Sequence, residues 1–228
     1  MVRVERCLDE LENGIKEVKD LIGQKENSIS IGTATARMLS DLMKAYLIQN
    51  TDVRVKLLQV TQHTELLHQL EHGEIDICIS SLPLQKNGIC CKKLIKESIY
   101  LIVPPNHKLA KRKKVSLKEL EKETFIFYTT ECGLGETVKY FCKQVHFNPN
   151  ISCECTTPEV TCGLVEAGLG LAFLPEYISS MEYTKGISWI PVNEPDMHRT
   201  IWVSWNEERY LTKAVCDFRE FLFTYFSK

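Results

Sequence analysis

The pattern of hydrophobic and polar positions changes near residue 28. Before that point, apolar side chains stand among Glu, Lys and Asp at spacings of 4, 3, 4, 3 and 4 residues. Alternating spacings of three and four are typical of the apolar seam of a coiled coil. The pattern predicts a dimerisation helix over residues 1–25, and the alternative is a helix packed on its own chain. The seam residues are Val4, Leu8, Leu11, Ile15, Val18 and Ile22.

From Ser28 onward the chain alternates between strand and helix patterns. The segment "SISIG" predicts a strand, and a helix with one apolar stripe follows it. The period-two segment "VRVKLLQV", a leucine-rich helix closed by Gly73 and the apolar strand "IDICIS" come next. Two successive strand–helix–strand units predict a parallel sheet with right-handed crossovers.

A second unit is predicted after the strand "SIYLIV", which ends at Pro104. Ser116 and Glu119 have the spacing of a capping box for a short helix. The strand "FIFY", an amphipathic helix and the strand "ISCEC" follow, and Thr157 and Pro158 then begin a further helix. The strands "LAFLP", "ISWIPV" and "TIWVSW" precede a last helix, whose wide apolar stripe must be buried.

The glycine pair in "LVEAGLGLAFLP" invites comparison with a phosphate-binding loop. A dinucleotide-binding loop follows a strand and opens a helix, because the helix N-terminus holds the pyrophosphate. Here a helix precedes the glycines and a strand follows them. Gly168 is therefore expected to end the helix with a positive φ, and Gly170 to form the turn into the strand.

Composition and charge narrow the class of protein. With 44% hydrophobic and 25% charged residues the chain has a globular composition, and a net charge of -2 gives no basic footprint for nucleic acid. The sequence shows neither an apolar run of membrane length nor a signal-like start, so a cytoplasmic protein without a membrane partner is expected. Its ten cysteines lie mostly in apolar runs without C-x-x-C spacing, which predicts reduced, buried thiols and neither a metal nor a cofactor.

Hydroxyl side chains recur where the predicted strands lead into helices. Ligands of open α/β sheets bind outside the carboxyl ends of the strands. Hydroxyls and free helix N–H groups together favour a carboxylate or another oxyanion, and the alternative is ordinary helix capping. The residues are Thr33, Thr35, Thr61, Thr64, Ser80, Ser81, Thr129, Thr130, Thr156 and Thr157.

Catalytic motifs give no support for an enzyme. The sequence has no G-x-S-x-G, Walker loop, H-E-x-x-H or strand–G-x-G-x-x-G–helix unit. Cys132 and Cys142 flank the start of a predicted helix, whose N-terminus would stabilise a thiolate. Redox sensing by this pair is therefore one hypothesis, and the alternative is that Cys142 faces the core.

The order of these motifs resembles the effector-binding region of LysR-type transcriptional regulators. The segments "SISIGTATARMLSDLMKAYLIQN", "LLHQLEHGEIDICIS" and "IYLIVPPNHKLAK" are similar to that family, and "LVEAGLGLAFLPEYI" is close to its "V-x-x-G-x-G-I-x-x-L-P" signature. The resemblance covers residues 1–228 and implies an α/β fold of the type 2 periplasmic-binding-protein class. Two Rossmann-like lobes joined by two crossover strands would follow a linker helix. The implied parts are the helix at 1–25, lobe I at 28–103 and 206–228, and lobe II at 104–205.

The resemblance implies a sensor of a small anionic metabolite, bound in the inter-lobe cleft to control transcription. Such a protein would be a homodimer or homotetramer, and would contact promoter DNA only through a winged helix-turn-helix domain that this chain lacks. The alternatives are a solute-binding protein of a transport system with the same fold and a redox-sensing regulator using Cys132 and Cys142. The effector-binding residues implied are Thr33, Thr35, His63, Thr64, Ser80, Ser81, Thr129, Thr130, Thr157 and Pro158.

Overall fold

A computed structural model describes residues 10–11, 13–15, 17–19, 22, 27–33, 39–60, 62–128, 133–194 and 196–227. The chain forms two compact units: unit 1 holds the described residues up to Ile95 and from Ile201 onward, and unit 2 is Lys96–Thr200. Both borders lie inside long strands, β4 (Ile89–Val103) and β10 (His198–Asn206), which continue from one unit into the other. The borders expected from the sequence, after Val103 and before Asn206, fall at the ends of these strands instead.

Unit 1 is built on a mixed sheet with the strand order β2-β1-β3-β10-β4. β1 pairs in parallel with both β2 and β3, whereas β10 pairs antiparallel with β3. The parallel pairings confirm the two successive strand–helix–strand units predicted from the hydrophobic pattern. The first three strands are β1 (Ser28–Thr33), β2 (Arg54–Gln59) and β3 (Ile77–Ser80).

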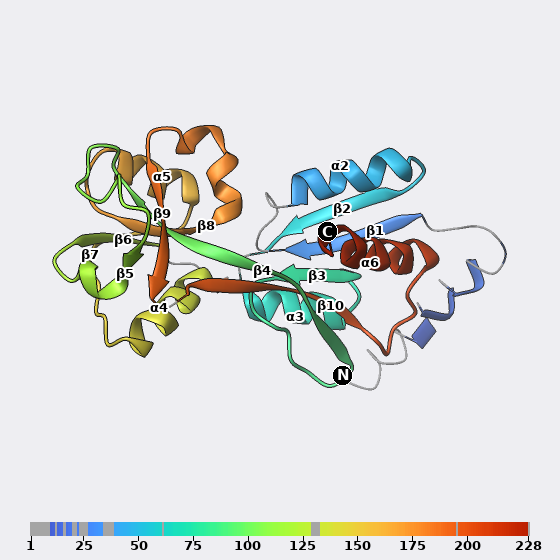
Figure 1. The fold of residues 1–228 in the computed structure, drawn as a ribbon. Coiled ribbons are helices and arrows are strands. Elements are labelled where there is room, and N and C mark those ends of the chain that lie inside the picture. The colour runs from blue at the N-terminus through green and yellow to red at the C-terminus, as the bar shows by residue number, and fades with distance from the viewer. Residues whose placement is uncertain are drawn as a thin grey trace. The chain divides into compact units, whose positions relative to one another are not determined.

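Helices cover both faces of the unit 1 sheet (Figure 1). The side chains of Ile77 and Ile79 in β3 join the hydrophobic cluster of α2 and α6, whereas Cys78 joins the cluster of α3. Successive strand residues point to opposite faces, so one short strand supplies both layers of the core. The helices are α2 (Ser40–Gln49), α3 (His63–Glu71) and α6 (Lys213–Phe226).

The wide apolar stripe of α6 is buried, as its pattern predicts. Phe218 and Leu222 are fully buried in the cluster shared with α2. The Tyr46 ring of α2 meets Phe218 edge-on, with 4.9 Å between ring centroids, and lies 5.1 Å from Phe221. The last helix therefore closes one face of the unit 1 core.

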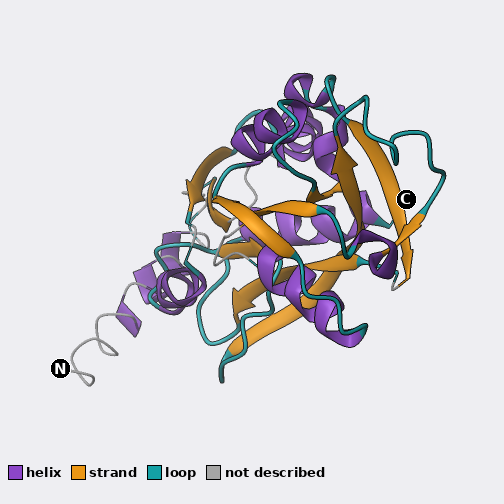
Figure 2. Cartoon of the chain, turned by 90° about the vertical axis from the view of Figure 1, so that its left-hand side faces the viewer, coloured by secondary structure: helices purple, strands orange, loops and turns teal. Residues whose placement is uncertain are grey.

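Unit 2 combines a parallel strand pair with strands that flank β4. β6 pairs in parallel with β7, β8 and β9 pair antiparallel with β4, and β5 pairs in parallel with β9. Helices lie around these strands (Figure 2). The strands are β5 (Val115–Ser116), β6 (Thr124–Tyr128), β7 (Asn150–Cys155), β8 (Ala172–Pro175) and β9 (Ser188–Glu194). The helices are η2 (Leu117–Leu120), α4 (Leu134–Gln144), α5 (Pro158–Glu166), η3 (Glu176–Ser180) and η4 (Glu182–Thr184).

Local sequence signals placed several boundaries correctly. The capping box at Ser116 is present, and the Ser116 N–H donates to Glu119 Oε2 at 3.0 Å. Gly168 has a φ of +80°, and the N–H groups of Gly168 and Leu169 donate to the carbonyls of Val165 and Leu164 at 2.9 and 3.1 Å. These two bonds form a Schellman motif, which confirms Gly168 as the helix stop.

The extent of one predicted strand is corrected by the structure. The strand predicted at "SIYLIV" is only the last part of β4, which begins at Ile89 and includes the partly exposed, polar residues that obscured its pattern. Its beginning is recognisable only from pairing with β10. Gly170 lies between the helix stop and β8, as expected, and a Cβ there would be 3.0 Å from the Thr124 carbonyl oxygen. Close approach of β6 therefore favours glycine in this turn.

Candidate functional site

In unit 1 the carboxyl ends of the parallel strands meet at one edge of the sheet. Thr33, the last residue of β1, pairs with Ile79, and Ser80 follows as the last residue of β3. α3 begins at His63, shortly after β2 ends on the other side of β1. The fold thus brings Thr33, Ser80 and the start of α3 to the edge where α/β proteins bind ligands.

The hydroxyls at this edge differ in exposure. Thr33 is completely buried, and Ser80 and Ser81 retain only 3% and 5% of their accessible surface. The Ser80 hydroxyl donates to the carbonyl of Leu82 at 2.7 Å, which fixes the turn after β3. Thr64, in the first turn of α3, is exposed. Thr64 is therefore the side chain of this set that a solute reaches without rearrangement.

His63 links the start of α3 to the loop between β3 and β4. Its Nε2 lies 3.3 Å from the carbonyl oxygen of Pro83, and the ring is half-buried. The N-cap residue Gln62 makes no side-chain hydrogen bond to the helix. The first N–H groups of α3 are thus not capped by Gln62, and helix N-termini attract anions.

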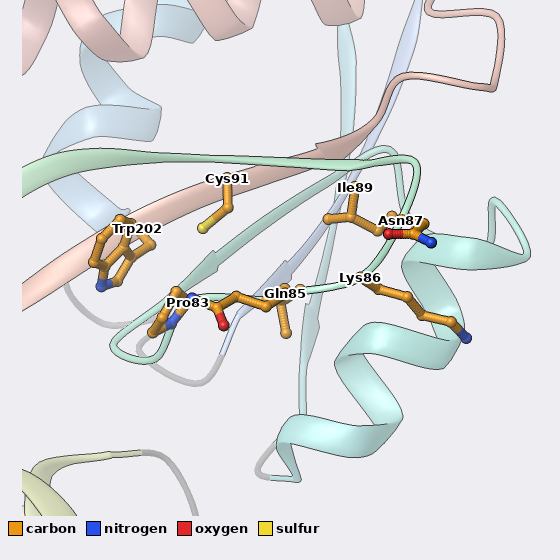
Figure 3. Close-up of a pocket in the computed structure, with 8 residues that line it drawn as sticks. Pro83, Gln85, Lys86, Asn87, Ile89, Cys91 and Trp202 are labelled. Carbon is orange, nitrogen blue, oxygen red and sulfur yellow. The ribbon is translucent and has the colours of Figure 1, made fainter.

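The same loop forms one wall of a pocket of about 520 Å³ (Figure 3). The Cys91 sulfur on β4 and the Trp202 ring on β10 face the loop across it. The Lys86 ammonium is ion-paired with Glu71, and the Lys93 ammonium lies 5.6 Å from the Trp202 ring centroid. Among the described residues predicted to bind the effector, none lines this pocket. Its lining residues are Pro83, Leu84, Gln85, Lys86, Asn87, Ile89, Cys91 and Trp202.

In unit 2, Thr157 and Pro158 occupy the N-cap and first position of α5, as predicted. Thr157 Oγ1 accepts from the Val160 N–H at 3.5 Å, and the Thr161 hydroxyl donates to the Thr157 carbonyl at 2.9 Å. The Thr157 side chain is exposed while it caps the helix. Three further predicted effector-binding residues, Thr35, Thr129 and Thr130, lie outside the described residues.

The cysteines whose environment is described have free thiols. Burial raises the pKa of Cys78 and Cys162 to about 12 and that of Cys142 to about 11. Cys142 lies in the unit 2 core, as one of the two sequence-based hypotheses expected. A buried thiol with a raised pKa is a poor redox sensor, because the thiolate is the reactive form. Cys132 lies outside the described residues, so a role for the Cys132 and Cys142 pair stays a prediction.

A buried ion pair on the two long strands was not predicted from the sequence. Arg199 Nε donates to Glu97 Oε2 at 2.7 Å, and the Tyr177 N–H donates to Glu97 Oε1 at 3.0 Å. The Arg199 guanidinium also lies 5.3 Å from the Tyr177 ring centroid. A signal was available, because each charge interrupts an apolar strand pattern, in "ESIYLIV" and "RTIWVSW".

The apolar seam at the N-terminus is exposed where the structure describes it. Residues 10–11, 13–15 and 17–19 are helical. Leu11, Ile15, Val18 and Ile22 expose 64%, 55%, 55% and 63% of their surface, so these side chains do not pack on their own chain. Val4 and Leu8 lie outside the described residues.

Residues 23–227 match the LysR substrate binding domain family. The chain belongs to this family. The uncharacterised HTH-type transcriptional regulator YybE of Bacillus subtilis is 28% identical over 229 residues, which cover 99% of this chain and 77% of YybE. The transcriptional dual regulator GltC of the same organism is 27% identical over 232 residues, covering 100% of this chain and 77% of GltC.

A solved structure similar to this LysR substrate binding domain is the effector binding domain of QuiR in complex with shikimate. It has a TM-score of 0.73 and 21% identity, and the match covers 88% of this chain and 97% of that one. The likeness confirms the α/β fold of the type 2 periplasmic-binding-protein class. The family confirms the predicted role, the effector-sensing part of a LysR-type regulator, and the relatives named above are regulators rather than enzymes.

Among the described helices of this LysR substrate binding domain, none is long and apolar enough to cross a membrane.

Proposed function

We propose that this LysR substrate binding domain senses a small carboxylate through the carboxyl ends of its strands. The observation that carries the proposal is the edge of the unit 1 sheet where Thr33, Ser80 and the start of α3 come together. Hydroxyl donors and helix N–H groups suit a carboxylate, which accepts several hydrogen bonds. The shikimate bound to the QuiR domain is itself a carboxylate, which agrees with this class of ligand.

In unit 2 the proposed contacts are Thr129, Thr130 and the start of α5 at Thr157 and Pro158. Thr35, His63, Thr64 and Ser81 complete the proposed set in unit 1. Thr157 would offer a ligand its exposed hydroxyl, because Pro158 has no N–H and the Val160 N–H already donates to Thr157 Oγ1.

The proposed signal is a population shift. A ligand changes the equilibrium between two conformations only by its difference in affinity for them. The effector would therefore bind one arrangement of the regulator more tightly, and the change would pass to promoter DNA through a winged helix-turn-helix domain. We place this regulator in the cytoplasm.

The exposed seam of Leu11, Ile15, Val18 and Ile22 supports self-association as a dimer, or as a tetramer built from dimers. Four aliphatic side chains that are each more than half exposed favour burial against a second copy of the helix. Dimerisation through this helix would give the attached DNA-binding domains a defined pairing.

A titration with small carboxylates tests the anion proposal. Isothermal calorimetry with shikimate, benzoate and citrate should find at least one ligand whose affinity falls about tenfold or more, roughly 1.4 kcal/mol, in Thr64→Val. Thr35→Val and Thr129→Val should behave alike. Thr224→Val, an exposed threonine on α6, is the matched control and should bind normally. If Thr64→Val, Thr35→Val and Thr129→Val bind every ligand with the affinity of the wild type and of Thr224→Val, the proposed contacts are ruled out.

A further inference from the structure

Two cysteines of β7 lie side by side at the end of the strand. Cys153 and Cys155 are separated by one residue, so an extended strand presents both on the same face. Their sulfur atoms are 3.9 Å apart. Cys155 is the last residue of β7 and stands two positions before Thr157, the N-cap of α5.

The separation of the sulfurs suits a shared ion better than a disulfide. Two thiolates bound to one ion at about 2.3 Å and a tetrahedral angle lie about 3.8 Å apart. In a disulfide the sulfurs are about 2.05 Å apart, and the Cα atoms at positions i and i+2 of a strand, about 6.6 Å apart, are near the limit for one. One bridging atom therefore fits the strand with little movement, whereas a direct bond would distort it.

The surroundings admit a ligand from one side. Cys155 is 6% exposed and belongs to the unit 2 core, and Cys153 is half-buried at the border of that core. The sulfur of Cys153 also lies 3.8 Å from the carbonyl oxygen of Glu154. Burial and the neighbouring Cys153 thiol raise the pKa of Cys155, so a ligand has to displace the proton of this thiol. Solvent therefore reaches the pair on the side of Cys153, whereas the sulfur of Cys155 lies in the unit 2 core.

The described residues contain no group of three or more His, Cys, Asp or Glu side chains that could hold a metal ion. A ligand at the β7 pair would thus receive two protein thiolates and no further protein ligand from that part of the chain. This condition excludes a closed structural zinc centre, which takes four protein ligands. It favours thiophilic species that are satisfied by two thiolates or complete their coordination with water.

We propose that Cys153 and Cys155 form a two-thiolate site for a thiophilic metal or metalloid, such as a trivalent organoarsenical or a soft divalent cation. With phenylarsine oxide, two S–As bonds form and the oxygen leaves as water with both thiol protons, so arsenic keeps its oxidation state. A divalent cation would displace the two protons and bridge the same sulfurs. This proposal does not depend on the proposed carboxylate binding. A ligand bound to both sulfurs would stabilise the end of β7, next to the start of α5.

Intact-mass spectrometry of the reduced, folded protein with one equivalent of phenylarsine oxide tests the metalloid. The wild type should gain one phenylarsenic group less two hydrogens, and the adduct should survive excess glutathione but not dithiothreitol, because only a dithiol competes with a bidentate site. Cys153→Ser and Cys155→Ser should each lose the glutathione-resistant adduct. The matched control is the double variant Cys90→Ser/Cys91→Ser, which removes the other adjacent pair and should keep it.

A parallel titration with Cd²⁺ alone tests the metal, through the ultraviolet charge-transfer absorbance of cadmium thiolates. One equivalent should produce this band in the wild type and in the Cys90/Cys91 control, and Cys153→Ser should remove it. Binding of only one of the two probes would identify the ligand class. Circular dichroism checks that Cys153→Ser, which removes the more exposed sulfur, is folded like the wild type. The proposal is overturned if neither probe binds the folded wild type, or if folded Cys153→Ser binds both probes as the wild type does.

Discussion

Removal of Arg199 tests the energetic role of the buried ion pair on the long strands. The side chains of Arg199 and Glu97 are 3% and 8% exposed, and their charged atoms are 2.7 Å apart. Arg199→Met keeps the bulk of the side chain but leaves the Glu97 carboxylate buried without its cation, while the Tyr177 N–H still donates to it. Breaking a buried pair in this way costs about 3–5 kcal/mol, since the remaining charge stays away from water.

The double variant Glu97→Gln/Arg199→Met should restore much of that loss. The glutamine carbonyl can still accept from the Tyr177 N–H, and no buried charge is left. Replacing both charges by neutral groups of similar volume is often close to neutral, so the cycle should show a coupling free energy of about 2 kcal/mol or more.

Urea unfolding followed by tryptophan fluorescence and far-ultraviolet circular dichroism measures these differences. For a slope of about 2 kcal/mol per molar urea, Arg199→Met should lower the midpoint by roughly 1.5–2.5 M. The control Lys185→Ala removes an exposed ion pair in the same unit. The side chains of Lys185 and Glu182 are 73% and 89% exposed. This variant should cost less than about 1 kcal/mol. Equal midpoints for Arg199→Met and Lys185→Ala, or additive single effects, would refute this reasoning.

Three further predictions concern the helix seam, the buried thiols and a glycine. Ile15→Ser should raise the dissociation constant of the dimer, measured by sedimentation equilibrium, because it removes an apolar side chain from the seam. An unchanged constant would contradict dimerisation through this helix. Burial raises the pKa of Cys162 from 9.0 to about 12. The neutral thiol therefore contributes fully to the free energy of unfolding below pH 9, and this contribution is lost as the pH rises toward 12. Urea titrations should show a smaller loss of stability at alkaline pH for Cys162→Ala than for the wild type. Gly168→Ala should cost about 1 kcal/mol, because φ is +80°, whereas Gly163→Ala, with open space around a Cβ in α5, should stabilise by roughly 0.5–1 kcal/mol. Equal midpoints for the two glycine variants would argue against the helix stop at Gly168.

The parts of the fold that the sequence predicted are those governed by local chemistry. Gly168 and the Ser116 capping box act within a few residues, so their signals stand next to the structure that they produce. The uninterrupted apolar run of β3 likewise indicates that both faces of its sheet are covered. The family resemblance added the order of the two units, which periodicity alone does not contain.

The features that the sequence did not predict depend on partners far along the chain. Glu97 and Arg199 are 102 residues apart, so neither charge indicates its partner. The beginning of β4 is polar and becomes a strand only by pairing with β10. The pair of Cys153 and Cys155 was visible as C-x-C, but only the distance between its sulfurs distinguishes a shared site from two separate thiols. The positions of Thr33 and Ser80 at the ends of their strands were predicted from the sequence, whereas the deep burial of Thr33 follows from packing.

The path of β10 has a consequence for the order in which the protein matures on the ribosome. Unit 2 is one continuous stretch, Lys96–Thr200, and its residues all emerge before β10 is complete. Unit 1 must wait, because β10 lies between β3 and β4 in its sheet and α6 closes its core. Domains generally fold as units during synthesis, so the middle of this chain is free to fold first. Until the C-terminus arrives, the edge of β3 and the apolar faces of β1 and α2 stay open to chaperones and to aggregation.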